Sequence, residues 1–168
     1  MTEFNIVHEL EGEPEMFWRI FFDDAYNAEL YRRLQMKERT VLEQKETPEG
    51  RSWVVRVIPS RDLPGFMKKI VGGDFGYIER TTFTRDKNRL DIKIEPTMMK
   101  ERTRIGGVYT IDPYAPGKLR RTFKGSVTVD LPLVGKKIEG VIIDDMQKSY
   151  ATAAGVTREW LARGGKPA

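Results

Sequence analysis

The first part of the chain changes from alternating to helical spacing of its apolar residues. Residues 4–10 alternate between apolar and polar side chains, which indicates a strand. Pro14 then suits the first turn of a helix, where its missing N–H costs nothing. Apolar residues follow at helical spacing over 16–21, and Asp24 is placed to cap a second short helix over about 25–36. We therefore expect one strand followed by two short helices.

The middle of the chain alternates with a period of two, in segments separated by turn residues. The alternation predicts six strands, at about residues 39–46, 52–59, 75–83, 90–94, 103–111 and 119–131. Proline, glycine, aspartate and asparagine between them favour turns, notably at 112–117. A short helical turn is expected at 66–71, closed by Gly72 and Gly73. Such alternation is typical of an antiparallel sheet with one buried face.

The chain ends in a long amphipathic helix, expected from residue 133 or 134 to residue 163. At 100° per residue its apolar stripe contains Ile138, Ile142, Ala153, Val156 and Trp160. Two polar residues one turn apart, Asp145 and Ser149, fall inside this stripe. Gly164 and Gly165 end the helix, so residues 164–168 are expected to form a flexible tail.

Three segments carry a resemblance to a known superfamily. They are 63–69 (LPGFMKK, followed by Gly72 and Gly73), 131–139 (LPLVGKKIE) and 157–161 (TREWL). Over residues 2–163 the chain resembles the START-like superfamily, also called SRPBCC or helix-grip, and most closely a bacterial branch of unknown function. The resemblance implies a single α+β domain at 2–163. Its curved antiparallel sheet of about seven strands would wrap around a long C-terminal helix, with two short helices after the first strand.

The resemblance also implies a deep cavity between sheet and helix, in which members of the superfamily hold lipids, sterols or polyketides. The apolar faces of the predicted strands and helix are candidates for its wall. The predicted ligand-binding residues are Trp53, Val55, Val57, Phe66, Ile70, Phe75, Tyr77, Tyr109, Phe123, Val127, Ile142, Asp145, Met146, Ser149, Ala153 and Trp160. The alternative is an ordinary filled core, because a void leaves no signature in composition.

Two of these candidates are polar and lie on the final helix. A buried carboxylate without a partner is costly, so Asp145 and Ser149 are expected to point into the cavity and bind the polar end of a ligand. The alternative is that the helix is rotated slightly and Asp145 pairs with an arginine or lysine of the sheet. His8 shares a face with apolar residues and is interpreted as a core or rim histidine.

The segment around Phe66 and Ile70 mixes apolar and basic residues. Glycines on both sides suit a moving lid, and Lys68 and Lys69 suit transient contact with anionic lipid head groups. The alternative is a surface connection anchored by Phe66 and Ile70.

Composition narrows the chemistry. The 168 residues include no cysteine and one histidine, which excludes disulfides, thiolate metal sites and histidine-rich metal sites. We therefore expect no metal and no cofactor.

The net charge is 29 − 25 = +4. A basic band on the late strands is interpreted as a solvated outer face and not as a specific nucleic-acid site; its members are Lys100, Arg102, Arg104, Lys118, Arg120, Arg121 and Lys124. With no leader and no apolar span visible, a cytoplasmic protein is expected.

These observations favour a non-enzymatic protein that binds a small hydrophobic ligand for transport, sensing or sequestration. The first alternative is a polyketide cyclase or aromatase that uses the same cavity, with acid–base help from Asp145, Tyr77 or Tyr109. The second is a protein-interaction module with a vestigial cavity. The residues single out no catalytic group, and the oligomeric state stays open.

Overall fold

The computed structural model describes residues 1–60, 63–71 and 75–168. Gly72 and Gly73, expected to close the short helical turn, lie outside the described residues. The elements follow in the predicted order. They are β1 (Thr2–Glu11), α1 (Pro14–Phe21), α2 (Asp24–Arg33), β2 (Met36–Thr47), β3 (Gly50–Pro59), α3 (Gly65–Val71), β4 (Tyr77–Thr84), the 3₁₀ turn η1 (Arg85–Lys87), β5 (Arg89–Pro96), β6 (Thr103–Ala115), β7 (Lys118–Val129) and α4 (Gly135–Ala162).

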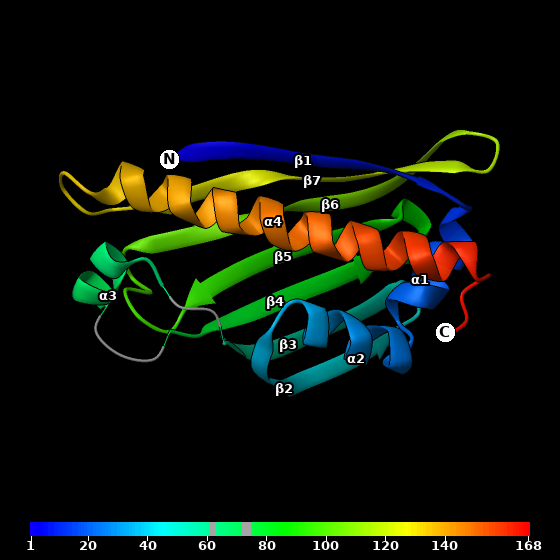
Figure 1. Cartoon of the computed structure of the whole chain (residues 1–168), viewed down its shortest axis with the longest axis horizontal. Coiled ribbons are helices and arrows are strands. Elements are labelled where there is room, and N and C mark those ends of the chain that lie inside the picture. The colour runs from blue at the N-terminus through cyan, green and yellow to red at the C-terminus, as the bar shows by residue number, and fades with distance from the viewer. Residues whose placement is uncertain (61–62, 72–74) are drawn as a thin grey trace.

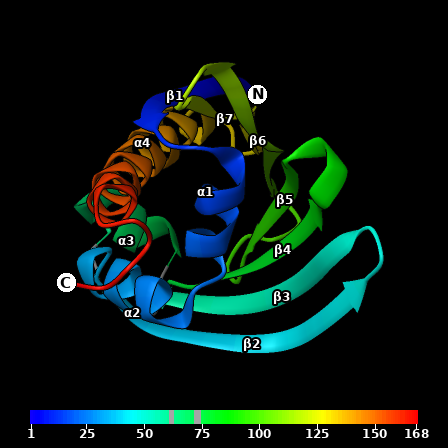
Figure 2. The ribbon, with the colours of Figure 1, turned by 90° about the vertical axis from the view of Figure 1, so that its right-hand side faces the viewer.

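The seven strands form one antiparallel sheet in the order β1-β7-β6-β5-β4-β3-β2. Each strand from β2 to β6 pairs with the next strand in the chain, whereas β1 forms one edge of the sheet by pairing with β7. Helix α4 packs on β1 and β7, and α1 and α2 contact its C-terminal part (Figure 1). Seen along the helix, the sheet curls around α4 and α1 (Figure 2). The predicted α+β architecture is therefore confirmed.

Glycines on two neighbouring strands allow this curvature. Gly107 on β6 lies opposite Gly125 on β7. A Cβ atom added to Gly125 would lie 2.1 Å from the carbonyl oxygen of Gly106, and one added to Gly107 would lie 2.5 Å from that of Lys124. Only glycine lets the two backbones approach so closely, and glycine in strands often marks such sharp bends.

The main core lies under the N-terminal two thirds of α4. Its members come mostly from β1, β6, β7 and α4. The ring of Phe123 lies 4.8 Å from that of Phe4 and 5.0 Å from that of Tyr150, between centroids. Because α4 packs on β1 and β7, it leaves the inner face of the remaining strands uncovered except where α1 contacts β6 and α2 contacts β2.

Several boundaries differ from those predicted, most clearly in α2, β6 and β7. Helix α2 is capped by Asp23, whose carboxylate accepts a hydrogen bond from the Tyr26 N–H, and it ends at Arg33 before the left-handed Gln35. Strand β6 continues into the expected turn at 112–117, because it stays paired with β7 up to Ala115, and the chain turns at residues 116 and 117. Strand β7 ends two residues early, at Val129.

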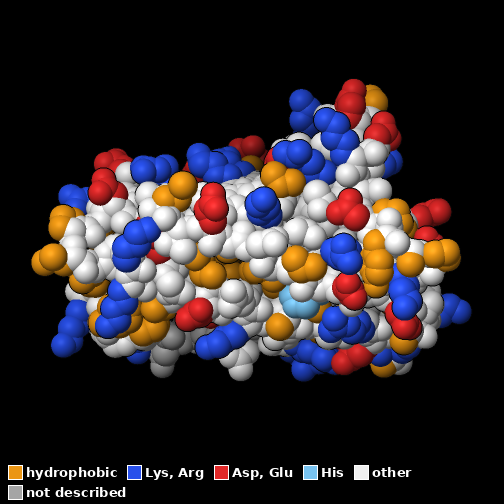
Figure 3. All heavy atoms as spheres, turned by 90° about the horizontal axis from the view of Figure 1, so that it is seen from above, with side chains coloured by type: hydrophobic (Ala, Val, Ile, Leu, Met, Phe, Trp, Pro, Cys, Tyr) orange, Lys and Arg blue, Asp and Glu red, His pale blue; other side chains and the backbone are white. Residues whose placement is uncertain are grey.

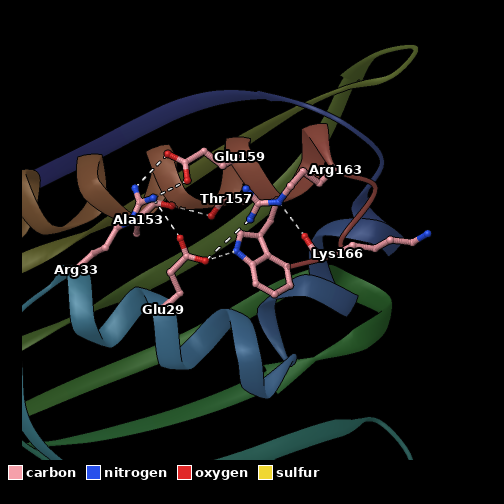
Figure 4. A network of polar contacts seen from close by, with 8 residues as sticks. Glu29, Arg33, Ala153, Thr157, Glu159, Arg163 and Lys166 are labelled. Carbon is pink, nitrogen blue, oxygen red and sulfur yellow. Dashed lines mark hydrogen bonds and ion pairs between the residues drawn. The ribbon is translucent and has the colours of Figure 1, made fainter. Parts of the chain in front are cut away.

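A polar network joins α2 to the C-terminal part of α4 (Figure 4). Arg33 forms two hydrogen bonds with the carboxylate of Glu159 and an ion pair with Glu29. Glu29 also accepts a hydrogen bond of 2.8 Å from the indole Nε1 of Trp160. Behind these contacts, Tyr26 and Thr157 share a buried hydrogen bond of 2.8 Å. The network holds α2 against α4 at one end of the sheet's concave side.

Candidate ligand-binding cavity

A cavity of about 980 Å³ lies between α4 and the part of the sheet that the helix does not cover. Strands β2 to β6 form its floor, α1, α2 and α3 contribute to its ends, and one face of α4 closes it. Ligand pockets are commonly about 300–1,000 Å³, so this volume suits a molecule of a few hundred daltons. Its lining is mostly apolar and aromatic, with polar and charged side chains as a minority.

The cavity brings together eleven of the sixteen predicted ligand-binding residues. They are Trp53, Val55, Val57, Phe75, Tyr77, Tyr109, Ile142, Asp145, Met146, Ser149 and Ala153. These residues are far apart in the sequence and meet because the sheet curls toward α4. The grouping follows from strand alternation, which placed most of them on one face before the fold was known.

The other five predicted residues do not line the cavity. Phe123 and Val127 are buried in the main core beneath α4. Trp160 packs with Tyr26 in a separate hydrophobic cluster. Phe66 is covered by Lys137, whose Nζ lies 4.3 Å from the ring centroid. Ile70 is 37% exposed.

Helix α3 turns a different face to the cavity from the one expected. Met67 is buried and lines the cavity together with Leu63 and Pro64. Leu63 and Pro64 precede the helix, and within it residues 66 and 70 share a face that does not include Met67. The apolar character of the segment was recognised from the sequence, but its rotation about the helix axis depends on tertiary contacts.

Asp145 lies at the rim of the cavity and not in a buried stripe. Its side chain is exposed, whereas Ser149 is half-buried. The buried positions of this part of α4 include Ile138 and Ile143, which pack into the core. The helix is thus rotated so that one flank of the predicted stripe faces the core and the other faces the cavity, which corrects the expectation of a buried Asp145.

Arg121 is the polar residue of the cavity wall that the sequence interpretation placed wrongly. It was assigned to a solvated basic band, but it is 3% exposed and lines the cavity. Its Nη2 atom donates to the carbonyl oxygen of Tyr150 at 2.6 Å and to His8 Nδ1 at 3.1 Å. The signal was present in the sequence, because position 121 shares the alternation of Leu119 and Phe123.

Glu79 is a second polar residue of the cavity wall, and the sequence pattern did not single it out. It lies two positions after Tyr77 on β4 and therefore shares a face of the sheet with it. Its carboxylate accepts a hydrogen bond of 3.1 Å from the Thr81 hydroxyl. Burial raises the pKa of Glu79, and the Thr81 hydrogen bond and the charge of Arg39 only partly oppose it. Arg39 itself lies over the ring of Tyr31, 4.7 Å from its centroid. The wall therefore holds a carboxyl group that takes up a proton more readily than usual.

Three tyrosines add neutral hydrogen-bonding groups to the lining. Burial raises the pKa of Tyr31 to about 12 and also raises those of Tyr109 and Tyr150 well above their usual value. Their phenols stay protonated at neutral pH, so each presents a donor as well as an acceptor.

Other classes of site receive no support in the described part of the chain. No group of three or more histidine, aspartate and glutamate residues there is arranged to hold a metal ion. Within the same residues, no helix combines the length and hydropathy that crossing a bilayer requires. Of the expected basic band, Arg120 pairs with Glu9 and Arg121 faces inward. On the face drawn in Figure 3, positive and negative side chains are interspersed.

Solved structures with the same fold extend over almost the whole chain. Protein TTHA0849 from Thermus thermophilus superposes with a TM-score of 0.67 at 14% identity, over 98% of this chain and 100% of the other. The Zhui aromatase/cyclase from Streptomyces sp. R1128 gives 0.66 at 10% identity, over 98% and 96%. A START superfamily protein from Mycobacterium smegmatis gives 0.60 at 14% identity, over 96% and 97%. At these identities the likeness concerns the fold, which is START-like as predicted.

Sequence comparisons place the chain in a family. Comparison with curated proteins finds no match. A family model described as a protein of unknown function, DUF2505, matches residues 5–161. The expected similarity to a branch of unknown function is thereby confirmed. With nearly its whole length matched and a START-like fold, the chain belongs to the DUF2505 family.

Proposed function

We propose that this protein binds a small hydrophobic ligand in the cavity between its sheet and α4. The observation that carries the proposal is the 980 Å³ cavity itself, walled by aromatic and aliphatic side chains with a small number of placed polar groups. Such a combination is typical of small-molecule sites. A folded domain gains nothing by leaving so much apolar surface unpacked, because close packing of its interior stabilises it.

The size and lining of the cavity limit the classes of ligand that it can hold. Trp53 and Phe75 suit contact with rings or hydrocarbon chains, and Val55, Val57 and Ile142 add aliphatic surface. The ligand classes supported are therefore lipid-like, sterol-like or polyketide-like molecules. Transport, sensing and sequestration all need such a site, and each would return the ligand unchanged.

Native mass spectrometry of the purified protein, followed by solvent extraction, tests the proposal directly. We expect a discrete adduct of a few hundred daltons that extraction releases. For protein purified without its ligand, the neutral fluorescent probe N-phenyl-1-naphthylamine reports binding to the cavity.

A matched pair of variants localises that binding. Ala153 lines the cavity, whereas Ala151 is exposed on the same helix. Ala153→Trp is expected to weaken probe binding by roughly fivefold or more, about 1 kcal/mol, whereas Ala151→Trp should bind like the wild type. Equal binding by both variants, or no probe binding by any of them, would contradict the proposal.

An enzyme of the cyclase kind is the second candidate, and Glu79 is the observation that favours it. A carboxyl group whose pKa is raised by burial is suited to proton transfer near neutral pH. Glu79 is better suited to proton transfer than Asp145, which is exposed at the rim of the cavity. Incubation of the extracted ligand's precursors with wild type and Glu79→Gln separates the two candidates. A binder leaves the molecule unchanged in both, whereas an enzyme converts it and loses conversion, but not binding, in the variant.

A further inference from the structure

We propose that the ligand of this cavity carries an acidic oxygen group, a carboxylate or an enolate, and that Arg121 binds that group. The inference rests on the proposed function and names the chemical class of its ligand. It begins with burial: Arg121 lies on β7, is 3% exposed and lines the cavity.

Arg121 has no acidic partner of its own. Within residues 1–60, 63–71 and 75–168, no aspartate or glutamate forms an ion pair with it, whereas its neighbour Arg120 pairs with Glu9 at 3.0 Å. A guanidinium keeps its charge at every physiological pH. Burying a charge without an opposite charge is costly, and a ligand that supplies the missing charge offsets part of that cost.

The groups that surround the guanidinium are neutral. Burial and the charges of Arg121 and Arg158 lower the pKa of His8 to about 4, so His8 is uncharged at neutral pH and accepts at Nδ1. The Tyr150 carbonyl accepts the second hydrogen bond from Nη2. The rings of Tyr109 and Tyr150 lie 5.9 and 5.6 Å from the guanidinium carbon. These neighbours orient the positive charge, and none of them neutralises it.

The guanidinium has donors to spare for a ligand. Both hydrogen bonds described above are made by Nη2, so the three N–H donors on Nε and Nη1 are available to the Tyr109 phenol and to a ligand. Two parallel N–H groups of an arginine match the two oxygens of a carboxylate. The site therefore suits a planar, acidic oxygen group better than a hydroxyl.

The apolar part of the ligand has room along β6. The cavity extends from Tyr109, beside Arg121, to Ile105 and Thr103. Six residues of strand span about 20 Å. Met67 of α3 lines the cavity as well, on an apolar part of its wall. The ligand is therefore amphipathic, with its acidic end at Arg121 and a long hydrocarbon or fused-ring body.

The carboxyl of Glu79 does not occupy the proposed anion site. In the sheet order its strand β4 stands three strands away from β7, about 14 Å at the usual strand spacing, and Glu79 is in register with Val127 and not with Arg121. Arg39 acts on it electrostatically, and its raised pKa favours the uncharged form. Glu79 is therefore not the acidic partner of Arg121 within the cavity.

Fluorescence titration with cis-parinaric acid and with its methyl ester, at about pH 7.5, tests the assignment. The two probes share one hydrocarbon chain and differ in the charge of the head group. Wild type is expected to bind the acid on the order of tenfold more tightly than the ester. Arg121→Met should abolish this preference, so that acid and ester bind with similar affinity. Arg120→Met, which removes the same charge from an exposed position on the same strand, should keep it.

The outcomes separate this inference from the proposed function. Equal binding of acid and ester by wild type, or an undiminished acid preference in Arg121→Met, overturns the assignment and leaves the proposed function standing. Binding of neither probe, nor of N-phenyl-1-naphthylamine, overturns both. If Arg121→Met does not fold, Arg121→Lys keeps the charge but loses the fork of parallel donors. It must then lower the acid preference, and an unchanged preference refutes the role of Arg121.

Discussion

Replacing Glu139 by glutamine tests how the first turns of α4 are joined to the sheet. Glu139 is 2% exposed. One carboxylate oxygen accepts the Val129 backbone N–H at 2.9 Å, and the other accepts from the Thr2 hydroxyl and from Lys136 Nζ. The carboxylate thus connects β1, the end of β7 and α4, although Thr2 is 137 positions away in the sequence. Glutamine keeps the shape but brings an N–H₂ group toward donors, and it removes the charge.

The size of the effect follows from the pKa of Glu139. Burial alone would raise that pKa, but the hydrogen bonds from Thr2, Val129 and Lys136 outweigh burial and lower it from 4.5 to about 2. The difference corresponds to about 3 kcal/mol of stability. Because the pKa is lowered in the folded state, this contribution is complete above pH 4.5 and is lost as the pH falls toward 2.

Urea unfolding followed by tryptophan fluorescence measures the effect. At neutral pH the free energy of unfolding of Glu139→Gln is expected to fall by about 3 kcal/mol, and at about pH 3 the gap to wild type should shrink by about half. Glu3→Gln, at an exposed position of β1, serves as the control and should change stability by less than about 0.5 kcal/mol. A loss for Glu139→Gln no larger than that of the control, or a gap independent of pH, would refute the reasoning.

Two further predictions concern the sheet. His8, the single histidine of the chain, should titrate in NMR near pH 4, because burial and the charges of Arg121 and Arg158 disfavour its protonated form. Since its pKa is lowered on folding, protonation of His8 removes stability as the pH falls from 6.5 toward 4, and a midpoint near 6.5 would contradict the contact with Arg121. Gly125→Ala should lower the free energy of unfolding by about 2–3 kcal/mol, because its Cβ would lie 2.1 Å from a carbonyl oxygen of β6. Urea unfolding measures this loss, and an alanine variant as stable as wild type would show that the sheet does not need the glycine there.

Local patterns along the chain determined the architecture. Strand alternation and helical spacing predicted every strand and helix in its right order, and the resemblance carried by segments such as 131–139 indicated the START-like fold. These signals are readable because each depends on neighbouring residues: alternation reports a sheet with one buried face, and spacing of about 3.6 residues reports a helix. Boundaries shifted by a few residues where a cap or a tertiary contact decided the matter, as at Asp23 and Val129.

Only the tertiary structure decided which residues on the inner face of the sheet line a cavity and which pack into the core. The alternation along the strands puts Arg121 and Glu79 on the same faces as apolar residues, yet Arg121 was interpreted as part of a solvated band, and only the curled sheet shows that both border one cavity. Asp145 moved to the rim because a rotation of α4 by a fraction of a turn exchanges core-facing and cavity-facing positions. Such rotations depend on how every contact packs at once, and empty volume leaves no trace in composition. The sequence therefore determined the walls, and the packing of α4 on β1 and β7 decided that they enclose a space.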